Sequence, residues 1–522
     1  ARSAYGYMVV DKDFSRFANG DPAGGLADER VTIAHEYNHL LQNAYDFAAD
    51  KWMFETTAVY MEEKAYPAIN GYLDYLPAWA QTPQVPLTSF PDQPPASLRP
   101  YGSAVWNHWL DHRYGPPIVR AAWEIAAPAG DFAAGAYGQA VTTAGGAGFG
   151  DEFDRFATAT AEWNAPGSGF PDAYPDVARS GFLSAGSQSQ AFTLPHATFA
   201  LFDVPIPPTA PTAIRVTASL PADTSGAVAL VGRTGPNTND GTVTTNLTEL
   251  PAGGSSCAQL DSPSTFGRLT AVVVNSDVSR SGFDQSARDW VYTHDAPAVT
   301  ARVDGPGAPT ATTGAPQATT DHTTTVGALV DPVLTDTTWS IEYGKTSAYG
   351  ARSARQALPA STACGAAVAA GLSGLAANTL YHYRAAASNA FGSAHGADAT
   401  FRTARDVTAP IVELKVARRA RIGRVVRKGL AFKLRCSERC AGTARIVLSR
   451  RAARKLGLPA LLGKLRVNLA PRRAFAARRL KLGVRARSRI AALKRVDTTL
   501  TVRLSDASRN SRKVHRRVTL RH

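Results

Sequence analysis

The spacing of apolar residues changes along this chain, and that change limits the possible folds more than any other feature. Up to about residue 163 they recur every three or four residues, which predicts helices, for example over 151–163. From about Phe182 onward, short alternating runs such as Ala213–Ala218 and Leu269–Asn275 lie between Gly, Pro, Asn and Asp clusters. That pattern is typical of β-sandwiches.

The length of the chain predicts several domains, because 522 residues exceed what one hydrophobic core usually sustains. We expect a mainly α (α+β) domain over residues 1–182, followed by three all-β sandwich-like domains over 183–299, 300–403 and 404–522. We expect no transmembrane segment, because the longest apolar runs fall well short of the roughly 18 residues of a membrane-spanning helix.

The segment Val31–Gln42 reads as one helix that carries the pattern His-Glu-x-x-His. Residues four apart on a helix lie nearly above one another, so His35 and His39 can direct their imidazoles at one metal ion. Glu36 would then lie beside the ion without binding it, where it can take a proton from a water molecule that the metal activates. The pattern predicts a zinc site and hydrolytic chemistry.

The residues around the pattern are consistent with a helix. Polar groups suited to the exposed amides of a helix start are present at Asp28, Glu29 and Thr32. An apolar side would be formed by Val31, Ala34, Leu41 and Ala44. The competing interpretation is therefore an ordinary amphipathic helix whose histidines bind no metal.

A catalytic zinc ion needs a third protein ligand as well as an open position. We assign this role to Glu55, an acid on an otherwise apolar turn of a second expected helix, Trp52–Lys64, because such an acid needs a partner. Glu62, two turns later on nearly the same face, is the alternative ligand. Asp46 and Asp50 are more remote candidates.

His35, Glu36 and His39 followed by Glu55 resemble the gluzincin group of metallopeptidases, which includes the thermolysin-like enzymes. The resemblance covers about the first third of the chain. The phrases HEYNHLLQ and WMFETTAVYMEE resemble a set of bacterial secreted metallopeptidases more closely than they resemble thermolysin itself. It implies a Zn²⁺ ion held by His35, His39 and Glu55, with Glu36 as the general base in peptide-bond hydrolysis.

The chain departs from the thermolysin-like pattern in two places. The spacing from His39 to Glu55 is shorter, and Val59 stands where those enzymes keep an acid that orients a histidine ligand. Support for the histidines must therefore come from elsewhere. A metzincin is excluded, because Gln42 and Tyr45 stand where that group needs a glycine and a third histidine.

Amide hydrolysis also needs a hydrogen-bond donor for the oxyanion. The candidates on a helix expected over 99–115 are Tyr101, His108, His112 and Tyr114. We choose Tyr101 as the catalytic donor, because it lies at the start of that helix, where a phenol could reach into a cleft. For each of the four, a packing or surface role is the alternative.

The N-terminus carries no secretory signal pattern and begins with Ala1 in place of an initiating methionine. Residues Tyr5–Val10 read as a strand, and in gluzincins a strand of this kind borders the substrate cleft. The resemblance also implies more sheet upstream than 30 residues can supply. We therefore expect a processed or truncated chain.

The middle of the chain predicts two β-modules. Residues 183–299 would form an accessory sandwich. Its role would be either purely structural or the binding of substrate or glycan. Residues 300–403 resemble a bacterial extracellular fibronectin type III module, on the strength of Thr338–Gly344 and Leu375–Arg384. The composition of Gly305–Pro316 is typical of a flexible linker.

Charge is distributed unevenly. Residues 406–522 contain 34 Lys and Arg against five acids, a net charge of +29, so the first 405 residues carry −14 of the total of +15. Ala431–Cys436 and Leu500–Leu504 alternate apolar with polar or basic residues as half-exposed strands do. We expect a basic β-domain that attracts an anionic cell-envelope polymer, and the alternative is a composition bias with no partner. We expect no specific nucleic acid, since few aromatics accompany the arginines.

The four cysteines favour an oxidising compartment. Cys436 and Cys440 could form a disulfide, and the alternative, a zinc half-site, lacks a second close cysteine pair to complete it. Cys257 and Cys364 are either free or join two domains.

Two functions from different classes follow. The first is a secreted zinc metallopeptidase that cleaves a peptide or protein substrate and associates with the cell surface through its tail. The second is an inactive surface adhesin that uses its β-modules and basic domain. The intact His35, Glu36, His39 and Glu55 favour the peptidase.

Overall fold

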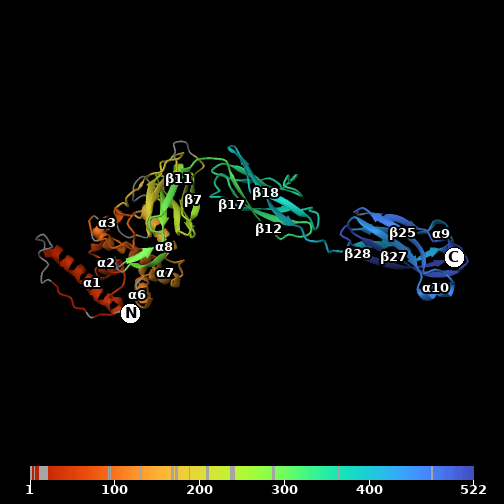
Figure 1. Ribbon diagram of the computed structural model, residues 1–522, viewed down its shortest axis with the longest axis horizontal. Helices are drawn as coiled ribbons and strands as arrows, with labels where there is room; N and C mark the ends of the chain where they lie inside the picture. The colour runs from red at the N-terminus through yellow and green to blue at the C-terminus, as the bar shows by residue number, and fades with distance from the viewer. Residues whose placement is uncertain are drawn as a thin grey trace.

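The computed structural model describes residues 3–4, 6–10, 22–91, 93–94, 96–129, 132–165, 168, 170, 174–186, 188–206, 211–235, 241–284, 289–362, 364–471 and 474–522. Figure 1 shows a helical N-terminal part followed by β-sheet domains that succeed one another along the chain. The expected multidomain architecture is confirmed at this level. Within these residues, no helix is both long and apolar enough to cross a membrane.

The N-terminal part is built from helices and short 3₁₀ turns. They are α1 (Pro22–Asp46), α2 (Lys51–Ala65), η1 (Gly71–Asp74), α3 (Leu76–Ala80), η2 (Ala96–Leu98), α4 (Arg99–Gly102), α5 (Ala104–Tyr114), α6 (Pro117–Ala129), α7 (Ala133–Thr143), α8 (Phe149–Ala159) and η3 (Thr160–Glu162). The helix expected over 99–115 is thus divided into α4 and α5 at Ser103.

Helix α1 differs from its prediction in two respects. It begins at Pro22, upstream of Asp28 and Glu29, and proline suits a first helical turn because its missing N–H has no helical acceptor there. Its buried stripe is also polar, and consists of His35, Asn38, Gln42 and Asp46, while Leu41 is 45 % exposed. The side that packs on the domain is therefore the one that carries the histidines.

The strand expected over Tyr5–Val10 is not found. Tyr5 lies outside the described residues, and residues 6–10 belong to no strand. Ala4 N donates to Asn43 O of α1 at 3.1 Å, so this segment lies along a helix. Extended residues without a neighbouring strand cannot complete a hydrogen-bond ladder.

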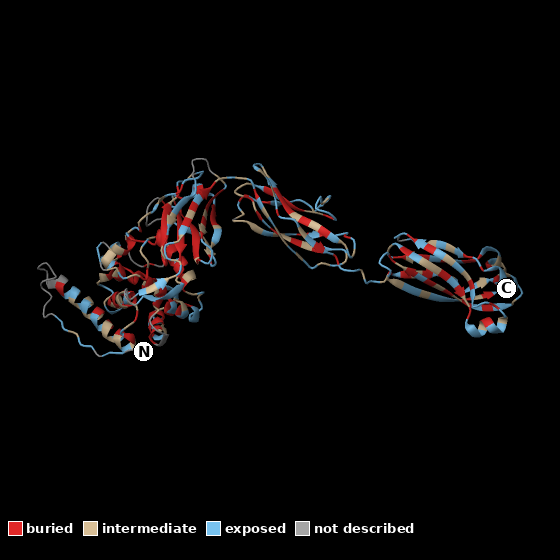
Figure 2. Cartoon of the chain, in the orientation of Figure 1, coloured by how far each residue is buried: buried red, intermediate tan, exposed pale blue. Residues whose placement is uncertain are grey.

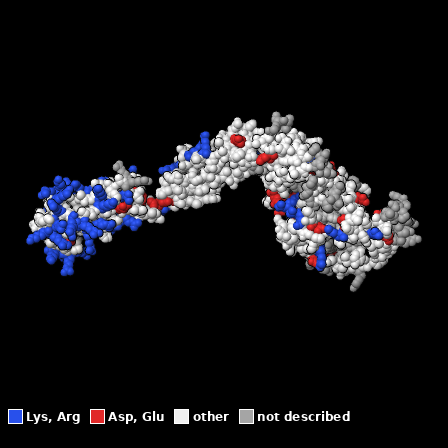
Figure 3. Space-filling view, turned by 180° about the vertical axis from the view of Figure 1, so that it is seen from behind, with Lys and Arg blue, Asp and Glu red and all other residues white. Residues whose placement is uncertain are grey.

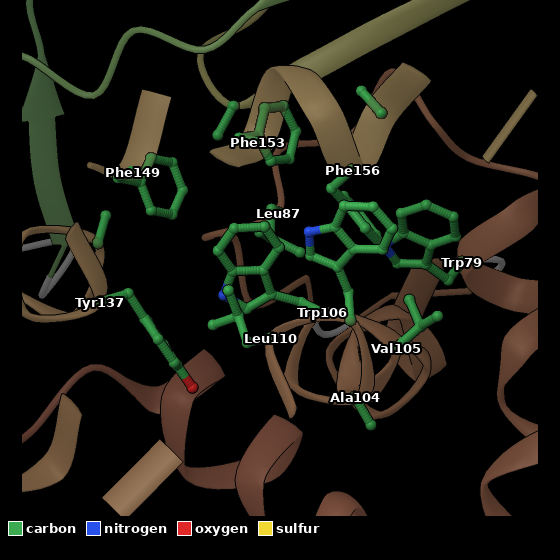
Figure 4. Close-up of a cluster of buried hydrophobic side chains, with 14 of the residues drawn as sticks. Trp79, Leu87, Ala104, Val105, Trp106, Leu110, Tyr137, Phe149, Phe153 and Phe156 are labelled. Carbon is green, nitrogen blue, oxygen red and sulfur yellow. The ribbon is translucent and has the colours of Figure 1, made fainter. Parts of the chain in front are cut away.

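A large aromatic core holds the other helices together. Trp79, Trp106 and Phe156 are fully buried, and Trp106 and Phe156 meet edge to face at 5.4 Å between ring centroids. Figure 4 shows these rings together with Phe149 and Phe153 of α8. Burial of such rings dominates the energetics of a domain core.

The second region forms a β-sandwich. Its strands are β1 (Gly181–Phe182), β2 (Gln190–Thr193), β3 (Thr198–Asp203), β4 (Ala213–Leu220), β5 (Gly226–Arg233), β6 (Val243–Leu250), β7 (Gly254–Asp261), β8 (Arg268–Asn275), β9 (Arg280–Asp284), β10 (Asp289–Tyr292) and β11 (Ala298–Asp304), with η4 (Pro263–Thr265) between β7 and β8. One sheet has the order β1-β3-β8-β5-β6 and the other β2-β11-β4-β7. Because β11 pairs with β2 and β4, this sandwich extends through Asp304, past the boundary expected at residue 299.

The first sheet of this sandwich is covered on both faces. Along β3, Phe199 and Leu201 join the aromatic core of the helices, whereas Ala200 and Phe202 join the core between the two sheets. Successive side chains of a strand point to opposite faces, so every residue of β3, β5 and β8 can be apolar. The helices and the first sandwich therefore share one continuous core.

The third region, beginning at Thr310, is a fibronectin type III-like sandwich. Its strands are β12 (Thr310–Gln317), β13 (Thr324–Asp331), β14 (Thr337–Gly344), β15 (Ala351–Arg352), β16 (Gln356–Leu358), β17 (Ala366–Leu372), β18 (Leu380–Asn389), β19 (Gly392–His395) and β20 (Ala399–Arg402). A sheet of order β12-β13-β17 faces one built on β14 and β18. Trp339 is buried between them, and Ala376 N donates to the Tyr381 hydroxyl at 2.9 Å, the tyrosine corner of such sandwiches.

The expected linker over Gly305–Pro316 is mostly a strand. Residues 310–317 form β12, which pairs with β13 and lies at the edge of its sheet. Pro316 is tolerated there because an edge strand has one unpaired side, and the register shifts between Thr313 and Pro316. The linker prediction, which relied on composition alone, was therefore wrong for the residues that form this edge strand.

The second and third regions are joined by covalent and ionic contacts. A disulfide links Cys257 of β7 to Cys364. Of the two alternatives for these cysteines, the structure therefore has the bond that joins two domains. Arg215 of β4 donates from Nη1 to both carboxylate oxygens of Asp331, at 2.8 and 2.9 Å, and from Nε to Asp304 at 2.7 Å.

The C-terminal domain is a basic sandwich with short helices. It contains β21 (Val412–Lys415), β22 (Arg419–Arg421), α9 (Ile422–Lys428), β23 (Leu430–Cys436), β24 (Cys440–Val447), α10 (Arg450–Leu456), β25 (Leu461–Leu469), β26 (Ala476–Leu480), α11 (Val484–Ala491), β27 (Arg495–Ser505) and β28 (Ser511–Arg521). Leu500, Val502 and Leu504 of β27 point inward, while Arg495 and Arg503 are exposed. Figure 2 shows this alternation of buried and exposed residues along the strands.

Candidate metal centre

Helices α1 and α2 bring the three predicted ligands together. His35 Nε2 lies 3.1 Å from Glu55 Oε2, and His39 Nε2 lies 3.7 Å from the same oxygen. The two imidazole rings meet edge to face with 4.7 Å between their centroids. One ligand atom from each residue therefore falls within a sphere small enough for one ion.

Glu62 holds the other side of His35. His35 Nδ1 lies 2.6 Å from Glu62 Oε1, and the side chains of the two residues are only 11 % and 5 % exposed. With Glu62 accepting from Nδ1, the other ring nitrogen, Nε2, is directed at Glu55 and is the nitrogen that a metal would take once it has lost its proton. Glu62 is thus placed to orient His35 and not to replace Glu55.

Gln42 holds the other side of His39 in the same way, but with a neutral amide in place of a carboxylate. Its amide nitrogen donates to Phe54 O at 2.9 Å and to Thr57 Oγ1 at 2.8 Å, which turns its oxygen towards His39 Nδ1 at 2.6 Å. Thr57 Oγ1 in turn donates to Met53 O at 2.6 Å. The network leaves Nδ1 of His39 as the donor and Nε2 free for a metal.

These residues fit a zinc ion. Two imidazoles that present Nε2 and one carboxylate are the His₂Glu ligand set of catalytic zinc sites. Each imidazole also has the hydrogen-bond acceptor at Nδ1 that metal-binding histidines almost always have.

Electrostatics at the site favour a cation between these groups. Burial by itself would lower the pKa of His35, but the hydrogen bonds to Glu55 and Glu62 outweigh it and raise the pKa to about 9. Burial would raise the pKa of Glu55, but its hydrogen bonds to His35 and His39 lower it to about 2. Without a metal, a proton on His35 balances the ionised Glu55.

Tyr101 lies against His35, and Glu36 follows His35 on α1. Glu36 is exposed on α1, so its carboxylate is accessible to water. The Tyr101 ring stacks on His35 with 6.0 Å between centroids. Burial, followed by the charge of its hydrogen-bond partner Glu55, raises the pKa of Tyr101, so the phenol keeps its proton.

The other candidates for an oxyanion donor lie elsewhere. His108 packs on Tyr60 and Tyr72, at 5.2 and 4.5 Å between centroids, and burial lowers its pKa to about 4. The Tyr114 hydroxyl donates to Glu152 at 2.6 Å. His112 is exposed near the end of α5.

The remote ligand candidates have structural contacts. Asp46 accepts from Ala48 N at 3.0 Å. Asp50 accepts from Ala133 N at 2.8 Å and from Trp290 Nε1 of the β9-β10 hairpin at 3.0 Å.

The orienting role of Glu62 and Gln42 was not assigned from the sequence. The departure at Val59 required support from elsewhere, and two signals were present. Glu62 follows Glu55 by two helical turns, and Gln42 follows His39 by one. Neither spacing, however, states which ring nitrogen is contacted.

No known protein family matches the sequence, and no curated protein matches it. Among solved structures, a two-domain fibronectin type III segment of chicken tenascin is 11 % identical, with 40 % of this chain and 98 % of that chain covered and a TM-score of 0.20. The sensor domain of the anti-sigma factor RsgI4 from Pseudobacteroides cellulosolvens is 15 % identical over 18 % of this chain and 87 % of that chain, with a TM-score of 0.15. Latent PorU from Porphyromonas gingivalis is 12 % identical over 66 % of this chain and 32 % of that chain, with a TM-score of 0.17.

TM-scores of this size carry no argument about family or function. The fold and the site themselves define the class: a multidomain protein whose helical part, with a candidate His-His-Glu metal site, precedes β-sheet domains, one of them fibronectin type III-like. Its two disulfides, Cys257–Cys364 and Cys436–Cys440, indicate an oxidising compartment such as the extracellular space.

Proposed function

We propose that the helical part is the catalytic domain of a zinc-dependent metallopeptidase. One observation carries the proposal: His35, His39 and Glu55 converge on one point, while Glu62 and Gln42 hold the far nitrogens of both imidazoles. A pair of chance histidines on an amphipathic helix would not need two separate acceptors at Nδ1.

In this proposal His35, His39 and Glu55 hold the zinc ion. When bound, zinc supplies a Lewis acid that polarises a carbonyl group and lowers the pKa of water. Glu62 and Gln42 keep both imidazoles in the tautomer that leaves Nε2 free.

Glu36 and Tyr101 would carry out the proton chemistry. Glu36 accepts a proton as water attacks the peptide carbonyl carbon, and delivers it to the amide nitrogen as the C–N bond breaks. The Tyr101 phenol, protonated at neutral pH, donates a hydrogen bond to the carbonyl oxygen as that oxygen gains negative charge. Peptides or proteins are therefore the proposed substrates.

In this proposal, the rest of the chain would attach the catalytic domain to the outer surface of the cell. We assign the C-terminal domain the role of binding an anionic cell-envelope polymer, because Figure 3 shows Lys and Arg side chains spread over it and nearly absent from the middle of the molecule. Opposite charges attract such a polymer at long range. The protein would then be a secreted peptidase associated with the cell surface.

The basic domain also supports a second candidate, a surface adhesin without peptidase activity. Residues 406–522, with a net charge of +29, would bind an anionic polymer whether or not the metal site is active.

Zinc content and cleavage of a casein-type substrate, measured on the same samples, separate the two candidates. We expect about one zinc per chain in the parent. Glu36→Gln should retain zinc and lose cleavage, whereas Glu55→Ala should lose both. Asp28→Asn, which neutralises an exposed acid on the same helix, is the matched control and should change neither.

No zinc after loading would contradict the peptidase. Bound zinc without cleavage in the parent would favour the adhesin.

A further inference from the structure

The C-terminal domain gathers three of its few acids at one end. Asp406 lies in the segment before β21, Glu438 in the turn between β23 and β24, and Asp506 directly after β27. One carboxylate oxygen from each lies within 4.8 Å of the others. We call these three residues the carboxylate cluster.

This grouping is unexpected in a domain with 34 Lys and Arg among residues 406–522. The other two acids of the domain form ordinary ion pairs, Glu413 with Arg435 and Asp497 with Arg495. In the part of the chain that the structure describes, no Lys or Arg forms an ion pair with the carboxylate cluster. His322, an imidazole of the preceding module, shares a second group of possible ligand atoms with Asp321 and Asp406. The cluster therefore has a histidine beside it but none of the many Lys and Arg of its own domain.

Asp506 has a buried oxygen that lacks a partner. The residue is only 8 % exposed, and its Oδ1 accepts from Asn510 N at 2.9 Å. Its Oδ2 is buried without a hydrogen bond. Burying a carboxylate oxygen without a donor or cation is costly, so this atom indicates a ligand.

The carboxylate cluster is held in place by its own loops. The disulfide Cys436–Cys440 closes the turn that carries Glu438, and Ile411 N donates to Ser437 Oγ at 3.0 Å. Asn510 Nδ2 donates to Asp406 O at 2.9 Å, which ties the leading segment to the β27-β28 turn.

We propose that Asp406, Glu438 and Asp506 form a calcium site. Ca²⁺ takes oxygen ligands, mainly carboxylates, carbonyls and water, in flexible geometries that three loops can supply. A bound ion would neutralise the repulsion and give Asp506 Oδ2 a partner. It would also stiffen the segment between the fibronectin type III-like module, whose last strand ends at Arg402, and the basic domain.

This proposal is independent of the peptidase. It concerns oxygen ligands in another domain, and its failure would leave the zinc site unaffected.

Calorimetric titration of the full, chelator-treated chain with CaCl₂ tests the proposal. We expect one site per chain with a Kd of about 10⁻⁴–10⁻³ M, the range of extracellular calcium modules. Glu438→Gln and Asp506→Asn should each weaken binding by roughly tenfold or more, because each removes a charged ligand. Asp497→Asn removes an exposed acid of the same domain and should bind calcium as the parent does.

Trypsin provides a second measurement through Arg405, an exposed residue beside Asp406. Calcium should slow cleavage after Arg405 in the parent but not in Glu438→Gln. Glu438→Gln serves as the main variant because Glu438 is less buried than Asp506 and its substitution is less apt to disturb folding. No binding heat in the parent up to about 10 mM CaCl₂, well above the expected Kd, would overturn the proposal. Equal weakening in Asp497→Asn would overturn it too.

Discussion

Substitution of Glu62 tests the architecture of the candidate metal centre most directly. In the structure its carboxylate lies 2.6 Å from His35 Nδ1 and points away from the convergence of His35, His39 and Glu55. Glu62→Gln keeps the shape of the side chain and removes its charge. Glu62→Ala removes the acceptor altogether.

The expected magnitude follows from the environment of this contact. Both side chains are nearly buried, and a hydrogen bond to a charged group is worth about 1.5–3 kcal/mol. Every 1.4 kcal/mol corresponds to about tenfold in affinity, which agrees with the roughly 10–100-fold cost of removing a partner behind a metal ligand. We expect Glu62→Gln to weaken zinc binding by about tenfold, because an amide oxygen can still accept, and Glu62→Ala by about 100-fold.

Competition with a chromophoric chelator measures these zinc affinities without relying on activity. Asp28→Asn is again the control, and circular dichroism checks that each variant is folded. A Glu62→Gln affinity within about twofold of the parent would refute the orienting role, since even the low end of the expected range is tenfold. Complete loss of zinc in Glu62→Gln would instead identify Glu62 as a ligand.

Three further outcomes are expected from the fold. Replacing Cys257 and Cys364 together by Ser should lower the free energy of unfolding by up to about 4.7 kcal/mol, the entropy value for a loop of roughly 100 residues, as measured by denaturant unfolding against the oxidised parent. Asp304, whose pKa is lowered by Thr217, Arg302 and Arg215 against the opposing effect of burial, contributes stability above its ordinary pKa of 3.8. Asp304→Asn should therefore be less stable than the parent at pH 7, and the gap in denaturant midpoint should close as the pH falls below that value; a constant gap would argue against an ionic role. Phe199→Ala should lower the free energy of unfolding by about 3–5 kcal/mol. It should also lower the temperature of a single calorimetric transition in which the helices and the first sandwich unfold together, and two separate transitions would contradict a common core.

The strands and helices themselves were largely predictable, because their signals are local. The expected strands over 213–218 and 269–275 lie within β4 and β8, and the alternation along 500–504 continues through β27. A strand at the edge of a sheet was less predictable. Pro316 and its neighbours resemble a linker in composition, and only pairing with β13 makes them a strand.

Contacts between distant segments were beyond prediction from local patterns. The sequence did not reveal that Phe199 and Leu201 of β3 complete the core of the helices, because alternate residues of a strand can serve two cores only where both faces are covered. It also left the pairing of Cys257 with Cys364 open, since that depends on where two separate sandwiches meet.

At the candidate metal centre, the sequence alone specified the residue types and the helical spacing of His35, Glu36 and His39, since a four-residue separation on a helix puts two side chains on one face. The tertiary structure decided the rest. It turned that polar face inward, brought Glu55 to Nε2 of both imidazoles, and placed Glu62 behind only one of them. Which nitrogen a carboxylate contacts depends on how α1 and α2 cross, and that crossing is set by packing between helices and not by the spacing within either one.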